Sequence, residues 1–160
     1  MVILLILNWI TLALITIQDY RDRSVYWFLY ALAGLLVLGI HMIQNPIYTV
    51  LLNSFSNLIF ISVLLLFAGL YSKIRFKKRL INESIGLGDV LFFIAMSFAF
   101  APISFLILFV FSLLFSLAIH LFLNPVKNAA TVPLAGHMAL FFGMVYAVLF
   151  FTKDYSLYAY

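Results

Sequence analysis

The chain has 160 residues, of which 67% are hydrophobic and 9% are charged, and its mean hydropathy is +1.22. A soluble domain of this length needs far more charged surface, so the composition excludes that class and predicts an all-α integral membrane protein. Nine Lys and Arg against five Asp and Glu give a formal charge of +4, and the absence of cysteine excludes disulfides, thiolate metal sites and cysteine nucleophiles.

Apolar runs predict about six transmembrane helices, so that residues 1–160 form a single polytopic membrane domain. The helices are expected at 1–18, 26–43, 47–71, 89–100, 103–123 and 132–151. The first run lacks a basic segment before it and a small-residue cleavage site after it, so we expect a retained helix rather than a signal peptide. The fourth run would be only about 18 Å long, against a hydrocarbon core of about 30 Å. It therefore either extends back towards Asn82 or begins inside the membrane.

The basic residues predict the orientation of the chain. Eight of the nine follow an odd-numbered helix, and only Lys153 does not; the eight are Arg21, Arg23, Lys73, Arg75, Lys77, Lys78, Arg79 and Lys127. The positive-inside rule places these loops in the cytoplasm and both termini outside. We expect a multi-pass protein of the cytoplasmic (inner) membrane. The positive charge is thus explained by topology and by contact with anionic lipid headgroups, and we expect the bilayer, not a nucleic acid, as partner.

Two of the five acidic residues are expected at the same membrane face. Asp19 follows the first predicted helix and Asp89 begins the fourth, and the topology puts both on the cytoplasmic side. Two neighbouring carboxyl groups cannot both ionise cheaply, so they share a proton. The ionised group can then accept a proton from water while the neutral one donates a hydrogen bond to a scissile carbonyl. This chemistry needs no metal or cofactor. The placement of Asp19 and Asp89 therefore predicts an aspartyl dyad.

The residues before Asp89 favour the same interpretation. In Gly86-Leu87-Gly88-Asp89, the glycines permit unusual backbone angles and a close approach by an extended substrate. An isolated Asp at a helix N-terminus is more often a cap. The pairing with Asp19 at a matching depth is what favours a functional site.

The two aspartate segments resemble a known family. The stretch 19–25, Asp-Tyr-Arg-Asp-Arg-Ser-Val, resembles the first aspartate motif of type IV prepilin and preflagellin peptidases, and 86–90, Gly-Leu-Gly-Asp-Val, resembles their GxGD motif. The run 132–136, Val-Pro-Leu-Ala-Gly, is similar to the proline-containing final segment of these enzymes. The resemblance covers nearly the whole chain in motif order, spacing and six-helix layout.

The resemblance implies a membrane aspartyl endopeptidase that removes the short basic leader of prepilin-like precursors at the cytoplasmic face, as part of pilus assembly or protein secretion. Asp19 and Asp89 fall on the two catalytic positions, and Gly86 and Gly88 fall on the GxGD glycines. Lacking cysteines, the chain resembles the short, peptidase-only members. Val-Tyr-Trp at 25–27 replaces the usual Ile-Pro-Asn, and Leu91 replaces a frequent Lys.

Two further acids are candidates for contact with a basic leader, namely Asp22 and Glu83. The simpler interpretation pairs Asp22 with Arg21 or Arg23 and leaves Glu83 solvated in a loop. The three histidines lack the spacing of a helical metal site, so no metal is expected. Two other functions remain open: a small transporter or channel subunit, and a non-catalytic assembly protein derived from the same family. The scarcity of mid-helix acids argues against an ion pathway across the membrane.

Overall fold

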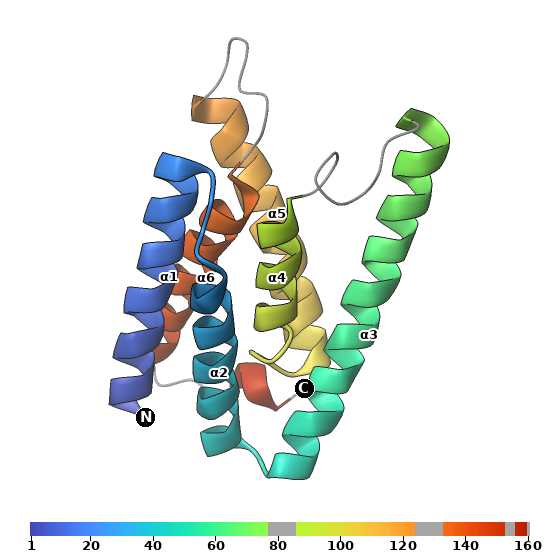
Figure 1. Cartoon of the computed structure of the whole chain (residues 1–160). Coiled ribbons are helices and arrows are strands. Elements are labelled where there is room, and N and C mark those ends of the chain that lie inside the picture. Colours follow the sequence, from blue (N-terminus) through green and yellow to red (C-terminus); the bar gives the residue numbers. More distant parts are fainter. Residues whose placement is uncertain (77–85, 124–132, 153–155, 160) are drawn as a thin grey trace.

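The computed structural model describes residues 1–76, 86–123, 133–152 and 156–159, and all regular structure within these ranges is helical (Figure 1). The elements are α1 (Val2–Asp22), α2 (Trp27–Gln44), α3 (Ile47–Tyr71), the π-helical turn η1 (Ser72–Phe76), α4 (Leu87–Met96), α5 (Pro102–Leu123), α6 (Leu134–Thr152) and the 3-10 turn η2 (Ser156–Tyr158). Five helices, all except α4, are long and apolar enough to cross a membrane. The expectation of an all-α, multi-pass membrane protein is therefore confirmed.

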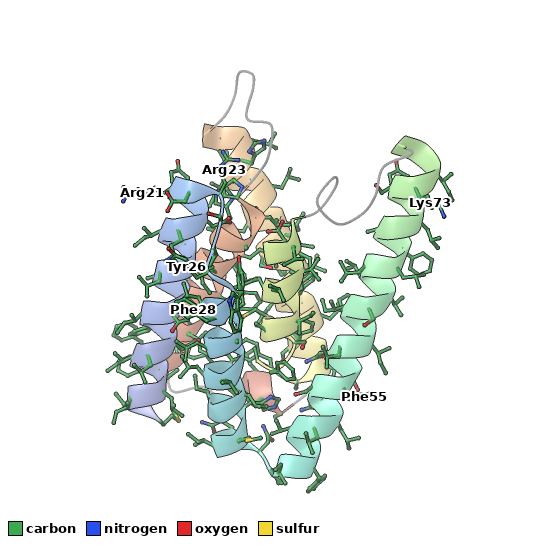
Figure 2. All side chains as sticks on the ribbon, in the orientation of Figure 1. Arg21, Arg23, Tyr26, Phe28, Phe55 and Lys73 are labelled. Carbon is green, nitrogen blue, oxygen red and sulfur yellow. The ribbon has the colours of Figure 1, made fainter. Side chains whose placement is uncertain are left out.

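The helices run alternately up and down the bundle. Both termini lie at one end of it in Figure 1. Arg21, Arg23 and Lys73 lie at the opposite end (Figure 2). This arrangement agrees with the predicted topology, and assignment of the basic end to the cytoplasm stays a prediction. The other loop bases at 77–79 and 127, together with Lys153, lie outside the described residues.

The core lies between α1, α2, α4, α5 and α6, while α3 runs along the outside (Figure 1). Aromatic rings fill the interior: Phe100 stacks on Phe142 and on Tyr146, with centroid distances of 6.5 and 5.4 Å. The interior is closely packed where α2 meets α4, because a Cβ atom on Gly34 would lie 3.4 Å from the Cα atom of Ala95. Many apolar side chains stay exposed, as a lipid-facing surface requires, and Phe55 on α3 is an example (Figure 2).

Helix α1 extends further than its apolar run indicated. It was expected to end at residue 18 but continues to Asp22, and Arg23 closes it in a left-handed conformation with φ of 54°. The buried residues of α1 lie on one face, because apart from one adjacent pair they are three or four positions apart: Leu5, Asn8, Thr11, Leu12, Ile15 and Asp19. Asp19 was predicted to follow this helix. It lies instead in the last turn of α1, on the buried face of the helix.

Helix α4 is shorter than predicted and shifted along the chain. It has ten residues, which is about 15 Å at 1.5 Å per residue, or roughly half of a hydrocarbon core. It begins after Gly86, which is extended, and it ends at Met96 instead of at residue 100. The carbonyl groups beyond Met96 are bonded by side chains from other helices. Asn57 donates to the carbonyl oxygens of Ser97 and Phe100 at 2.9 Å each, and His41 Nδ1 lies 3.1 Å from that of Phe98.

Candidate active site

The N-terminus of α6 brings Asp19 and Asp89 together. The backbone N–H of Gly136 donates to Asp19 Oδ2 at 2.6 Å, and the N–H of Ala135 donates to Asp89 Oδ1 at 2.9 Å. These are consecutive amides in the first turn of a helix, where backbone N–H groups have no intrahelical acceptor. The positive end of the helix dipole also favours acidic side chains there. Two carboxyl groups that are 70 residues apart in sequence thus bind neighbouring amides of the same helix.

Asp19 is held tightly against α6. The residue is 9% exposed, and a Cβ atom built on Gly136 would lie 3.0 Å from both its Cβ and its Oδ2. Thr16, one turn earlier on α1, donates to the carbonyl oxygen of Gly136 at 3.2 Å and to that of Leu12 at 2.9 Å. Both the N–H and the carbonyl of Gly136 are therefore bonded by α1, and the contact leaves room for glycine only.

Asp89 caps its own helix and also binds α6. Its Oδ2 accepts a hydrogen bond from the N–H of Gly86 at 3.2 Å, while Oδ1 binds Ala135. Asp89 lies in the first turn of α4, which does not span the membrane by itself. Burial raises the pKa of Asp89 to about 6; the Ala135 N–H opposes the rise, the Asp19 carboxylate adds to it, and the Gly86 N–H opposes it. Asp89 therefore keeps its proton at a pH where an ordinary aspartate has lost it.

The two glycines of the GxGD motif make room for neighbouring polar groups. A Cβ atom on Gly88 would lie 2.7 Å from the hydroxyl oxygen of Tyr30, and a Cβ atom on Gly86 would lie 3.1 Å from Asp89 Oδ2. The space beside Gly88 is thus filled by Tyr30, so this glycine serves the contact between α2 and α4. Direct contact of Gly86 and Gly88 with a substrate stays a prediction.

The other predicted site residues lie further away or outside the described residues. Asp22 is exposed, and its Oδ1 lies 3.8 Å from Arg21 Nε, which confirms the simple ion-pair interpretation. Its contact with a basic leader stays a prediction. Glu83 lies outside the described residues. In the described part of the chain, no three His, Asp or Glu residues gather as metal ligands would.

Sequence reasoning missed three groups at this site: the amides of Ala135 and Gly136, and the side chain of Tyr30. Pro133, directly before α6, signals a helix start and therefore free amides. Nothing in the sequence indicated which side chains those amides bind. Tyr30 carried no signal, since it resembles the many other aromatic residues of an apolar helix.

Comparisons of the chain with known protein families, with curated proteins and with solved structures found no match. The interpretation of function therefore depends on the geometry of the site and on the resemblance of the aspartate motifs.

Proposed function

We propose that the chain is a membrane aspartyl endopeptidase that cleaves the basic leader of prepilin-like precursors at the cytoplasmic membrane face. The observation that carries this proposal is the binding of Asp19 and Asp89 to consecutive amides of α6. A helix N-terminus leaves several amides without an intrahelical acceptor, and a cap usually satisfies one of them with a single side chain. Here two carboxyl groups from different helices bind neighbouring amides, which is the pairing that an aspartyl dyad requires.

The environments of the two carboxyl groups suggest their roles. Asp89 keeps a proton up to about pH 6 and is the hydrogen-bond donor to the scissile carbonyl. Oδ1 of Asp19 accepts no hydrogen bond from any described residue, so it is the oxygen that is open to a water molecule. The unequal environments of two adjacent titratable groups are what separate acid from base in such sites.

The reaction follows from these roles. The water oxygen forms a bond to the carbonyl carbon while its proton passes to Asp19, and Asp89 gives its proton to the carbonyl oxygen. In the second step the C–N bond breaks as Asp19 returns the proton to the leaving nitrogen. Asp89 then recovers a proton from the hydroxyl group as the carboxylic acid forms. One water molecule is consumed, and the dyad ends in its starting state.

Leader cleavage in membranes tests the proposal. The full chain is co-expressed with several prepilin-like reporters, each with a Lys-rich leader, a Gly and an apolar helix, and the product masses are measured. Asp19→Asn and Asp89→Asn are expected to abolish cleavage while inserting normally, because amides cannot share the proton. Asp154→Asn is the matched control, since the predicted topology puts Asp154 at the opposite membrane face.

Each outcome has a definite meaning. Cleavage by either dyad variant shows that the substituted aspartate is structural, and the dyad is then wrong. If the wild-type chain inserts but cleaves none of the reporters, the peptidase proposal fails. In that case a non-catalytic assembly protein becomes the better interpretation.

A further inference from the structure

Tyr30 packs between α2 and α4, and its hydroxyl group lies near Asp89. Tyr30 lies in the first turn of α2, and its side chain is buried, with 4% of the residue exposed. Its ring packs edge-on against Phe92 of α4, with 6.4 Å between centroids. Its hydroxyl reaches the backbone of Gly88, directly before Asp89, and it is within electrostatic reach of both Asp19 and Asp89.

The hydroxyl of Tyr30 has no hydrogen-bond partner among the described residues. Unlike the Tyr146 hydroxyl, that of Tyr30 is not among the buried polar atoms that lack a partner, so it can meet a ligand. Here an unused donor lies within electrostatic reach of two carboxyl groups, on a ring that is fixed by packing. A phenol stays protonated over the physiological pH range, so this group is a permanent donor. A carbonyl oxygen brought to the dyad would satisfy it.

The ring of Tyr30 alone does not explain why position 88 is a glycine. A Cβ atom at this position would lie 2.7 Å from the hydroxyl oxygen of Tyr30 but 3.5 Å from the ring carbon that carries it, which is an ordinary contact. With Phe at position 30, an alanine at 88 would fit. The glycine is therefore needed for the hydroxyl group and not for the ring.

We propose that Tyr30 is a third catalytic residue, whose hydroxyl donates a hydrogen bond to the carbonyl oxygen of the scissile peptide beside Asp89. The proposal rests on the peptidase function proposed above. No proton is transferred by Tyr30. The hydrogen bond strengthens as negative charge builds up on the carbonyl oxygen in the transition state, before the proton of Asp89 has reached it, so it lowers the barrier more than it aids substrate binding.

Steady-state kinetics of the purified full chain on a cleaved reporter test this role. Tyr30→Phe is expected to lower kcat by about 100-fold, as loss of an oxyanion donor does, while KM changes less than about twofold. The thermal midpoint and the pH profile of the residual activity should stay unchanged, since Phe keeps the ring and the phenol does not titrate in this range. Tyr146→Phe is the matched control: Tyr146 is buried on α6 and stacks on Phe100. This variant should retain the wild-type kcat.

A double variant tests the geometry without relying on activity. Gly88→Ala alone should lower the thermal midpoint, because its methyl group collides with the Tyr30 hydroxyl. Gly88→Ala combined with Tyr30→Phe should recover the wild-type midpoint, with the kcat of Tyr30→Phe. If Gly88→Ala is as stable as the double variant, the hydroxyl of Tyr30 does not occupy the space beside Gly88 and the proposal is overturned.

The kinetic outcomes separate this proposal from the peptidase function. If Tyr30→Phe cleaves at the wild-type rate while Asp89→Asn is inactive, Tyr30 only packs and the peptidase stands. If KM rises and kcat is unchanged, Tyr30 binds substrate without catalytic effect, which also overturns the proposal. If the wild-type chain cleaves no reporter, both proposals fall together.

Discussion

The close approach of α6 to Asp19 predicts opposite effects for two Gly→Ala substitutions on the same helix. At Gly136 the added methyl would lie 3.0 Å from Asp19 Cβ and Oδ2, whereas at Gly143 no atom lies within 4 Å. Alanine is favoured over glycine in a helix by roughly 0.5–1 kcal/mol. Gly143→Ala should therefore stabilise the protein by about that amount, because nothing opposes the gain.

At Gly136 the same gain is opposed by the loss of a short hydrogen bond. The methyl displaces the Asp19 carboxylate from the N–H that it binds at 2.6 Å. A hydrogen bond to a charged group contributes roughly 1.5–3 kcal/mol. The net effect of Gly136→Ala is thus a destabilisation of about 1–2 kcal/mol, which corresponds to a fall in Tm of roughly 2–8 °C. Leader cleavage should be lost as well, since Asp19 no longer faces Asp89.

Circular dichroism melts of the two variants in the same detergent measure these shifts, and the reporter assay measures cleavage. The expected pattern is a lower Tm without cleavage for Gly136→Ala, and an equal or higher Tm with full cleavage for Gly143→Ala. If Gly136→Ala melts no lower than Gly143→Ala and still cleaves, the contact between Asp19 and α6 is not as close as described. The assembly of the dyad on the α6 amides would then be refuted.

Three further predictions concern stability in the same melts. The folded chain binds the Asp89 proton up to about pH 6, against 3.8 for an ordinary aspartate, so stability should fall by on the order of 3 kcal/mol in total as pH rises from about 3 to about 7, and then level off. Asp89→Asn should show a smaller fall, with the remainder due to the buried Asp19, and an unchanged pH dependence would contradict the burial of Asp89. Asn57→Leu should cost roughly 2–6 kcal/mol by leaving two buried carbonyls unpaired, whereas Asn53→Leu, whose one contact is 3.5 Å long, should cost about 1 kcal/mol or less. Gly34→Ala should be tolerated, since its methyl would meet Ala95 at ordinary contact distances, while Gly34→Val should cost about 1–3 kcal/mol by overpacking.

The fold class was predictable because lipid restricts the choice. A chain this apolar must satisfy its backbone groups within helices, so the apolar runs locate the helices directly. The ends were less predictable, because they depend on contacts from elsewhere in the chain. The run at 89–100 stays apolar past Met96, but the helix stops there, where Asn57 and His41 bond the following carbonyls. No local pattern reveals that two residues from other helices will bond them.

The neighbours of each helix were also hidden from the sequence. In a soluble protein the apolar face of a helix points to the core, but here apolar residues face both lipid and interior. Topology placed Asp19 and Asp89 at one membrane face. It did not show that both would bind α6, or that Tyr30 of α2 would reach Gly88. Asp19 lies on the same face as Leu5, Leu12 and Ile15, but exposed apolar residues of α1 recur with the same spacing, so the sequence did not reveal which face is buried.

The short length of α4 explains why polar side chains are buried in the bundle interior. Asp89 can meet the α6 amides because α4 begins beside the start of α6, and a helix of ten residues must then end within the bundle interior. The carbonyl groups in the last turn of α4 are bonded by Ser97 and Ala99, and Asn57 and His41 bond carbonyl groups of the non-helical segment that follows. These buried polar residues are therefore not a second site. They stabilise the segment that follows α4 and so help to hold Asp89 in register with α6, which makes the position of a candidate catalytic carboxyl depend on side chains in the opposite half of the bundle.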